Sequence, residues 1–466
     1  MPLNPDRLFP PEPAVRDIAR TLYAGVKDLP ILSPHGHTEP RWYAENAAFP
    51  DPVSLFVRPD HYIFRMLFSQ GVPLEALGVP DKHGKVKNTD NRAIWRLFAA
   101  NWHLFRATPS RFWLEHSFET LFGITERLSQ KNADAIYDII AAALGKPEFR
   151  PRALYESFNI EAISTTDSAL DDLAWHDQIR QSNWKGRVLP AYRPDAVIDP
   201  DRLGFSERAA ELCSLAGTAV SWDGYLEAHR IRRQYFIARG ATSTDHGHPS
   251  ALTADLADDD AAALFDRVVA GNGSTADAEL FRAQMLTEMA RMSLDDGLVM
   301  QIHPGAFRNH SPWLFAEYGP DKGADIPQPT DYVLALKPLL DAVGTDPRLT
   351  LILFTLDETS SSRELAPLAG VYPALRIGPP WWFFDSPEGM RRFREATTET
   401  AGFYNTVGFN DDTRAFLSIP ARHDMSRRVD CGYLAGLVAD HRLDLDEAHE
   451  VAHDLAYGLA KRAYKL

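Results

Sequence analysis

The sequence predicts an α/β fold, a distorted (β/α)8 TIM barrel with a helical insertion after the first strand. Three observations predict it: eight short β-rich runs, helical patterns in most intervals between them, and polar residues where the runs end. The runs span residues 30–37, 160–168, 186–194, 240–247, 297–305, 349–358, 374–383 and 404–412. Among the intervals, residues 277–297 and 386–402 carry apolar residues at helical spacing. A strand followed by a helix, repeated eight times, is typical of this barrel.

The first interval is much longer than the others and divides the chain. Residues 38–150 are rich in Trp, Phe and His, and the pattern over residues 91–123 is helical. A connection of this length inside a compact domain carries secondary structure of its own. The sequence therefore predicts three parts, which are residues 1–37 with the first strand, an inserted helical subdomain at 38–150, and the rest of the barrel with C-terminal helices at 151–466.

Composition narrows the class of partner. The 466 residues are 45% apolar, carry a formal net charge of -15 and include only two cysteines. The negative charge disfavours nucleic acids and anionic membranes, and two cysteines give no disulfide framework. Residues 1–13 contain no apolar signal core, and no apolar run is long enough to span a membrane. We expect a cytoplasmic protein with a small-molecule partner, no nucleic acid and no membrane, and we leave open whether it forms a homo-oligomer.

Polar and aromatic residues stand where the predicted strands end. They are His35, His37, Asp167, Arg193, Asp245, His246, His303, Asp357, Glu358, Trp381, Trp382 and Asp412. In this barrel the carboxyl ends of the strands meet at one mouth, where catalytic residues lie, and packing needs none of these residues. The sequence therefore predicts one site at the mouth. Of the histidine pair His246 and His248, we expect at most His246 to line it.

His35 and His37 flank Gly36 at the end of the first run. In a strand, residues i and i+2 project to the same face, so both imidazoles can bind one divalent metal ion. Gly36 adds no bulk between them. The alternative is a pair of buried histidines with hydrogen-bond partners, and within a barrel metal binding is the stronger hypothesis.

The other candidate residues also have structural alternatives. Asp412, two residues before Arg414, is a metal ligand, a base or the cap of the next helix. His303 is a site residue or a core histidine, and Arg308 is a ligand-binding group or a surface arginine.

Two further pairs remain open in the same way. Arg193 and Asp245 belong to the site or form a salt bridge between neighbouring loops. Trp381 and Trp382 are packing residues or the wall against which a sugar ring lies.

Seven motifs occur in order over nearly the whole chain. They are PHGH (34–37), RPDHYIFRM (58–66), YRPD (192–195), TDHG (244–247), MQIHPGAFRN (300–309), WWFFDSPEGM (381–390) and VGFNDDTRAFLS (407–418). In order and spacing they resemble the uronate isomerases of the amidohydrolase superfamily. The resemblance implies interconversion of D-glucuronate with D-fructuronate, or of D-galacturonate with D-tagaturonate. The functional positions that it implies are His35, His37, Tyr62, Arg193, Asp245, His303, Arg308, Trp381, Asp412 and Arg414, with the register between Trp381 and Trp382 left open.

An aldose–ketose isomerisation removes a proton from C2, passes through an enediol and returns a proton to C1. It therefore needs a base and groups that stabilise the charged oxygens. Asp412 is the first choice as the base, with Tyr62 and His35 as proton carriers. We expect partial burial to raise the pKa of Asp412 toward neutrality.

The remaining roles concern the metal and the substrate. The expected cofactor is one divalent metal ion, zinc by preference, whose predicted ligands are His35, His37 and Asp412. Arg414 or this metal stabilises the oxyanion. Guanidinium groups bind carboxylates in bidentate geometry, so Arg193 and Arg308 are expected to bind the uronate carboxylate. The remaining expected substrate contacts are Asp245, His303 and Trp381.

Two other functions compete with isomerisation. The runner-up is a metal-dependent hydrolase or decarboxylase of the same superfamily, in which binuclear hydrolases use a carboxylated lysine from the fourth strand and a histidine from the sixth. The run at 240–247 has no lysine and the run at 349–358 has no histidine. A rival of another class is a non-catalytic protein that binds sugar acids. Loss of the predicted base or metal ligands would indicate it, and all of these residues are present.

Overall fold

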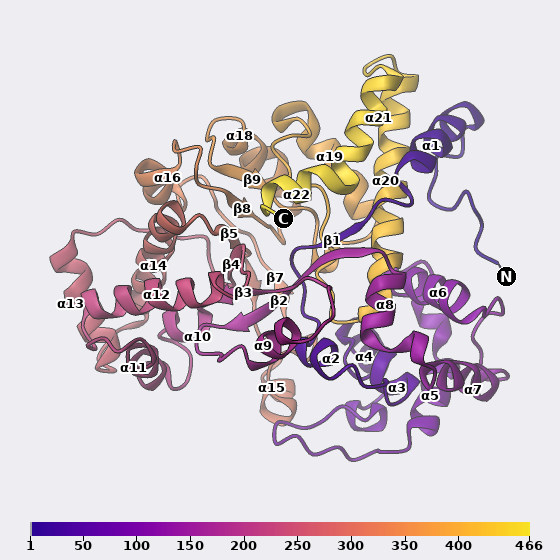
Figure 1. Cartoon of the computed structure of the whole chain (residues 1–466), viewed down its shortest axis with the longest axis horizontal. Coiled ribbons are helices and arrows are strands. Elements are labelled where there is room, and N and C mark those ends of the chain that lie inside the picture. The colour runs from indigo at the N-terminus through magenta and orange to yellow at the C-terminus, as the bar shows by residue number, and fades with distance from the viewer. Residues whose placement is uncertain (1) are drawn as a thin grey trace.

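The computed structural model describes residues 2–466 as a parallel sheet of seven strands with helices packed around it (Figure 1). The strands are β1 (Ile31–Ser33), β2 (Ile160–Ser168), β3 (Val188–Arg193), β4 (Ser243–His246), β5 (Val299–Ile302), β8 (Leu351–Leu353) and β9 (Leu375–Ile377). They pair in this order, each parallel to the next. A separate antiparallel pair joins β6 (Ala306–Phe307) to β7 (Ile326–Pro327). The predicted α/β class and strand order are therefore confirmed for seven of the eight runs.

The eighth predicted strand is not a regular strand. The structure has only an isolated bridge there, between Ile377 and Thr406. Gly408 and Asp412 have φ angles of 76° and 42°, which interrupt an extended conformation. The segment nevertheless reaches the other edge of the sheet, because the backbone N–H of Asp412 donates to the carbonyl of His35 at 3.2 Å. The sheet is therefore curled, and the segment that carries Asp412 lies beside the end of β1.

The first strand is shorter than predicted. β1 ends at Ser33, and the next residue, Pro34, has no N–H to donate to a sheet. His35 and His37 therefore lie in a loop. The N–H of His37 donates to the carbonyl of Thr413 at 3.0 Å, so this loop is still held by backbone hydrogen bonds.

The interval between β1 and β2 is helical. It contains α2 (Pro40–Glu45), α3 (Pro52–Phe56), α4 (His61–Ser69), α5 (Asn91–Ala100), α6 (Pro109–Phe122), α7 (Ala133–Leu144) and α8 (Pro151–Ser157). Asp51, Asp60 and Asp90 cap α3, α4 and α5 by accepting backbone N–H groups, which explains where these helices begin. Buried aromatic side chains such as Trp95 and Phe98 pack these helices together. The independence of this region as a subdomain stays a prediction.

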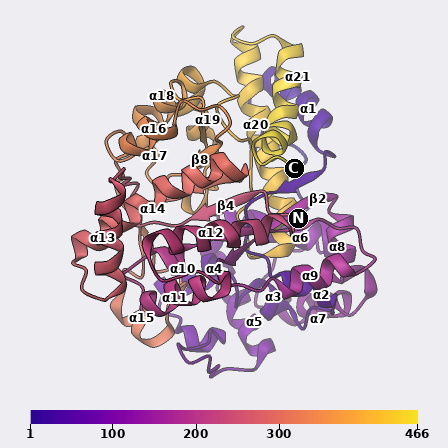
Figure 2. The ribbon, with the colours of Figure 1, turned by 60° about the vertical axis from the view of Figure 1, so that its left-hand side comes forward.

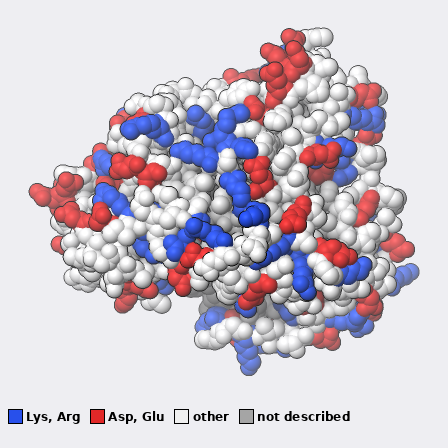
Figure 3. Space-filling model, viewed as in Figure 1, with Lys and Arg blue, Asp and Glu red and all other residues white. Residues whose placement is uncertain are grey.

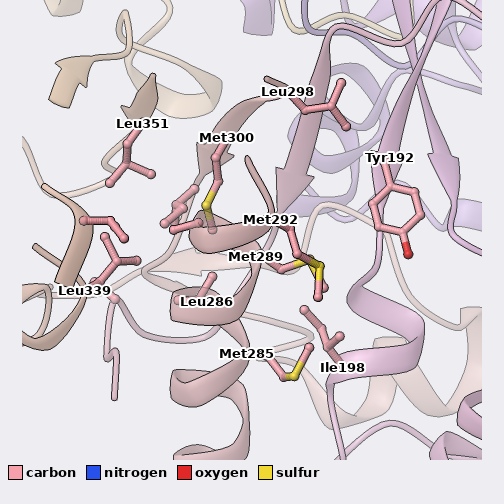
Figure 4. Close-up of a cluster of buried hydrophobic side chains, with 14 of the residues drawn as sticks. Tyr192, Ile198, Met285, Leu286, Met289, Met292, Leu298, Met300, Leu339 and Leu351 are labelled. Atoms are coloured by element: carbon pink, nitrogen blue, oxygen red, sulfur yellow. The ribbon is translucent and has the colours of Figure 1, made fainter. Parts of the chain in front are cut away.

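Most later helices connect successive strands and cover the sheet. They are α9 (Ala174–Gln181), α10 (Asp195–Ile198), α11 (Phe205–Ala216), α12 (Trp222–Ile237), α13 (Asp258–Val269), α14 (Thr275–Asp296), α15 (Pro312–Tyr318), α16 (Lys337–Val343), α17 (Glu358–Ser360), α18 (Ala366–Ala369) and α19 (Pro387–Ala401). Figure 4 shows apolar side chains of α14 in this core: Met285, Met289 and Met292 lie on the side of Ile198, and Leu286 lies on the side of Met300 and Leu339. Burial of this apolar face holds the helical layer on the sheet.

The two ends of the chain pack together. α1 (Pro13–Val26) lies beside α20 (Ile419–Ala439) and α21 (Leu445–His453) in both Figures 1 and 2, and apolar residues of all three form one buried cluster. The short helix α22 (Leu459–Ala463) follows. Among residues 2–466, no helix combines the length and apolar character needed to cross a membrane.

Surface charge is unevenly distributed. Figure 3 shows acidic side chains gathered over α13 at the left edge and over α21 at the top, whereas Lys and Arg side chains extend across the middle of this face. The formal net charge of -15 therefore coexists with a local concentration of cations.

Candidate functional site

A pocket of about 920 Å³ opens where the strands end. Its walls come from residues after β3, β4, β5 and β9, from α4 and from the segment after β9 that carries Asp412. Eight predicted site residues line it, namely His37, Tyr62, Arg193, His303, Arg308, Trp381, Asp412 and Arg414. The other two, His35 and Asp245, lie behind this wall in contact with Asp412 and His303. The structure therefore brings all ten residues together.

His35, His37 and Asp412 converge in the pocket wall. Nε2 of His35 and Nε2 of His37 lie 3.3 Å and 3.2 Å from Oδ1 of Asp412. One ligand atom from each residue lies within 4.8 Å of the others. Although Oδ1 of Asp412 is buried, it receives no well-directed hydrogen bond within the described residues. Two imidazole nitrogens and a carboxylate oxygen without a donor are a set that fits a divalent cation, so this is a candidate metal site.

The prediction that burial raises the pKa of Asp412 toward neutrality is wrong. Burial acts in that direction, but the contacts with His35 and His37 outweigh it and lower the pKa below its usual range. For His35, burial lowers the pKa, but the negative charges of Asp245 and Asp412 outweigh burial and raise it to about 9. In the metal-free protein, Asp412 is therefore ionised at neutral pH and pairs with a protonated His35.

A second group of charges lies on the other side of His35. Nε2 of His303 lies 2.7 Å from Oδ1 of Asp245, and Nη1 of Arg193 lies 3.3 Å from Oδ2 of the same carboxylate. Nε of Arg193 also donates to Asp195 at 2.8 Å. Burial would raise the pKa of Asp245, but its interactions with His303, His35 and Arg193 hold it well below the usual value. Asp245 therefore carries a negative charge that orients the groups around it.

Two arginines at the pocket wall are more exposed. Nη1 of Arg308 pairs with Asp325 at 2.8 Å, and the Arg308 guanidinium lies 5.3 Å from the ring centre of Trp382. Nη2 of Arg414 lies 4.0 Å from its nearest carboxylate, on Asp321. The side chains of Arg308 and Arg414 are 39% and 45% exposed, against 24% for Arg193. These two guanidinium groups therefore keep donors available for an anion in the pocket.

The two tryptophans of the WWFFDSPEGM motif both line the pocket. The ring of Trp381 lies against His303, with ring centres 5.1 Å apart, and its exposed fraction is 7%. Nε1 of Trp382 donates to Nε2 of His61 at 3.0 Å. Trp381 is therefore closer to the His303 group, whereas Trp382 belongs to the wall formed with Arg308.

Tyr62 reaches the pocket from the first turn of α4. The cap residue Asp60 accepts its backbone N–H at 2.8 Å, which fixes the start of this helix. The Tyr62 hydroxyl donates to both oxygens of Asp385, at 3.2 Å and 3.3 Å. Burial and the charge of Asp385 raise the pKa of Tyr62 well above its ordinary value. Tyr62 is therefore a neutral phenol at physiological pH.

Not every strand-end residue belongs to the site. Asp357 caps the short helix α17, and Asp167 accepts a hydrogen bond from Thr165; neither they nor Glu358 line the pocket. The expectation for the second histidine pair is also wrong, because His248 lines the pocket and His246 does not. The chain turns at this point, so the residue after Gly247 is the one that faces the cavity.

Sequence reasoning missed three buried charged residues of the site, Asp195, Asp385 and Arg422. Asp195 and Asp385 stand in the YRPD and WWFFDSPEGM motifs, and an acid within a run of aromatic or proline residues was an available signal. Arg422 lies in the first turn of α20, a helix that also carries Arg427 and Arg428, and no local pattern distinguishes it.

Comparisons with known proteins identify the family of the chain. The profile of the family described as glucuronate isomerase matches residues 14–464. A uronate isomerase from Brucella canis is 70% identical over 466 residues, which cover 100% of both chains. The crystal structure of glucuronate isomerase from Caulobacter crescentus has a TM-score of 0.98 and 61% identity, covering 100% of this chain and 97% of that one. A uronate isomerase from Thermotoga maritima has a TM-score of 0.92 at 26% identity, with 100% of both chains covered.

The curled parallel sheet, with a pocket of histidines, carboxylates and arginines where its strands end, is typical of an α/β enzyme. More specifically, the chain belongs to the glucuronate isomerase family. The resemblance carried by the seven motifs is therefore confirmed.

Proposed function

We propose that the chain interconverts D-glucuronate with D-fructuronate, and/or D-galacturonate with D-tagaturonate, by moving a proton from C2 to C1 through an enediol. The observation that carries the proposal is the family match over nearly the whole chain. The pocket supports it, because Asp412 offers a base while Arg308 and Arg414 offer cations to an acidic sugar. We also propose a cytoplasmic enzyme, in keeping with its two cysteines, which are free and buried.

We infer that the whole fold is a distorted (β/α)8 barrel of the amidohydrolase superfamily. The segment after β9 is bonded to Ile377 on one side and to His35 on the other, which supports its role as the eighth strand position. The helices between β1 and β2 share one buried cluster, which supports an inserted subdomain at residues 38–150; the cluster also includes Ile31, Ile163 and Phe416, so the insertion packs against the sheet.

We propose zinc as the cofactor, held by His35, His37 and Asp412. Two imidazole nitrogens with one carboxylate oxygen suit zinc and leave a position for a substrate oxygen. When bound, the ion polarises a substrate oxygen and lowers the cost of negative charge on the enediolate.

In the proposed reaction, Asp412 takes the proton from C2. Its lowered pKa keeps it ionised, which is the form that a base requires, but this pKa and its proposed bond to the metal both make it a weak base. Stabilisation of the enediolate must compensate, and Arg414, which lines the same pocket, supplies a positive charge for this purpose. Tyr62 keeps its proton, which its hydroxyl donates to Asp385, so in this proposal the hydroxyl turns from Asp385 to a substrate oxygen to deliver it, with His35 as the second proton carrier.

The proposed contacts for the rest of the sugar follow from charge and exposure. Arg308 is the first choice for the uronate carboxylate, since its guanidinium is more exposed than that of Arg193. Arg193 already pairs with two carboxylates, so its proposed contact with the substrate is secondary. The remaining proposed contacts are Asp245, His303 and Trp381, with Trp381 as the apolar wall against the sugar ring.

A coupled assay with both uronates tests the function. The protein is purified without chelator and assayed as prepared, after exhaustive chelation, and after zinc is restored. We expect turnover of at least one uronate, loss of activity on chelation and recovery with zinc. Absence of turnover with either uronate in zinc-loaded, folded protein would overturn the proposal.

A further inference from the structure

The buried side chain of Arg422 connects two parts of the pocket wall. Its Nη1 donates to Oδ2 of Asp385 at 2.7 Å and to the backbone carbonyl of Asp411 at 3.1 Å. Only 3% of the residue is exposed. The guanidinium also lies 3.6 Å from the ring centre of Trp113, which restricts the plane in which it can lie. One side chain on α20 therefore contacts both the segment before the last strand position, at Asp385, and the end of that strand position, at Asp411.

Asp385 connects Arg422 to Tyr62, because both side chains donate hydrogen bonds to its carboxylate. Asp385 is 5% exposed and accepts the Tyr62 hydroxyl and the Arg422 guanidinium at the same time. The charged form of a buried carboxylate is strongly destabilised when the carboxylate has no cationic partner. Even beside Arg422, burial raises the pKa of Asp385 to about 7. Arg422 is therefore needed to keep Asp385 as a charged acceptor that orients the Tyr62 hydroxyl.

The hydrogen bond to the Asp411 carbonyl restrains the backbone next to Asp412. Asp412 has a φ of 42°, a conformation that a residue other than glycine holds only when its surroundings enforce it. The preceding residue is held twice, because Arg422 donates to its carbonyl and His423 lies 3.1 Å from its carboxylate. Two consecutive residues of α20 therefore fix the backbone from which the Asp412 carboxylate projects.

We propose that Arg422 is a positioning residue that fixes Tyr62 and Asp412 relative to one another. It acts on Tyr62 through Asp385 and on Asp412 through the backbone of Asp411. The effect on turnover rests on the proposed isomerisation, whereas the effect on the metal site can be measured in the absence of turnover.

The first experiment measures zinc affinity by competition with a chelator. Arg422→Met removes the bond to the Asp411 carbonyl, and we expect zinc binding about 10- to 100-fold weaker, as is typical when a residue that orients a ligand is lost. Asp385→Asn leaves that bond in place, so its zinc affinity should stay within about threefold of wild type. Arg233→Met is the matched control, because Arg233 is a fully buried arginine paired with Asp296 at 2.6 Å and lies outside the pocket.

The second experiment measures kcat and KM for D-glucuronate in zinc-saturated protein. Arg422→Met and Asp385→Asn should each lower kcat by at least about 10²-fold while KM changes by less than about threefold. Arg422→Lys keeps a cation beside Asp385 and should recover at least about tenfold of the lost kcat. If Asp385 acts through Tyr62, adding Asp385→Asn to Tyr62→Phe should cause no further loss.

Several outcomes would overturn the proposal. Wild-type zinc affinity in Arg422→Met would exclude the effect on Asp412, and additive losses in the Tyr62–Asp385 double variant would exclude the effect on Tyr62. If Arg422→Met fails to fold, Arg422→Lys and Asp385→Asn are measured instead, and a wild-type kcat in both variants would reject the proposal. A wild-type protein that turns over neither uronate would contradict the proposed function, while the zinc comparison would still decide whether Arg422 positions Asp412.

Discussion

Nε2 of His37 lies 3.2 Å from Oδ1 of Asp412, although the two residues come from the first and last segments of the sheet. The backbone hydrogen bond from His37 to the carbonyl of Thr413, at 3.0 Å, holds these segments together. The contact therefore depends on the curling of the sheet, and it is the centre of the candidate metal site.

The first prediction concerns the metal. Protein purified without chelator should contain about one zinc per chain, and His37→Gln should reduce this content because one of three ligands is lost. Elemental analysis checks both. His83→Gln, at an exposed histidine, is the control and should keep its zinc. A content below about 0.2 metal per chain, together with full activity after exhaustive chelation, would remove the metal from the mechanism.

The second prediction concerns selection for the carboxylate. Wild type should use D-glucuronate far better than D-glucose, because an arginine without its anion is left desolvated and poorly paired. Arg308→Met should lower the ratio of the two kcat/KM values by at least about tenfold. Arg267→Met, at an arginine paired with Asp277 on the surface, should leave the ratio unchanged. Equal losses on both sugars would show that Arg308 is structural.

The third prediction concerns the route of the hydrogen. If a proton moves from C2 to C1, product formed in deuterium oxide should carry solvent deuterium at C1, which mass spectrometry or NMR detects. Asp412→Asn keeps the shape of the side chain but removes the base, and should lower kcat by at least about 10²-fold. Near-normal turnover in this variant would exclude Asp412 as the base, and Tyr62 would be tested next.

The fourth prediction concerns the pH dependence of stability and a residue outside the pocket, Asp167. Burial raises the pKa of Asp167 to about 7, against about 3.9 in an unfolded chain. Between these values the folded chain holds a proton that the unfolded chain releases, so the Asp167 contribution to the free energy of unfolding falls as pH rises from about 4 to about 7.

Asp167→Asn removes this dependence. The variant should be more stable than wild type at pH 8, by roughly 1 to 4 kcal/mol, and should lose most of this advantage near pH 4. Urea unfolding at both pH values measures it. Asp259→Asn, at an exposed position, should follow wild type at both. An advantage that does not change with pH would show that Asp167 is charged in the folded protein.

Much of the fold follows from local patterns. The runs that became β2, β3 and β5 are rich in β-branched and apolar residues, and such runs form strands wherever the chain buries them. The first and eighth runs were overestimated, because Pro34 ends β1 and the positive φ of Gly408 and Asp412 interrupts the last strand. A pattern of residue types indicates where a strand is favoured, but backbone conformation decides where it stops.

The sequence predicted those site residues whose location follows directly from their place at the end of a strand. Residues at the carboxyl ends of parallel strands must meet at one edge, so the placement of His303 and Arg193 followed from the fold class. The pKa of Asp412 did not follow, because its direction depends on whether burial or the neighbouring imidazoles prevail. The roles of Asp385 and Arg422 did not follow either, since their partners are distant in the sequence.

By itself, the sequence determined the α/β class, the order of the strands, the family and the set of polar residues at the strand ends. These properties depend on residue type, periodicity and motif order, all of which are local or linear along the chain. Only the tertiary structure decided that Oδ1 of Asp412 lies between His35 and His37, that Arg193 is neutralised by Asp195 and Asp245, and that Arg422 joins the walls of the pocket. Charge pairing and burial depend on distances between segments remote in sequence, and those distances exist only once the chain is folded.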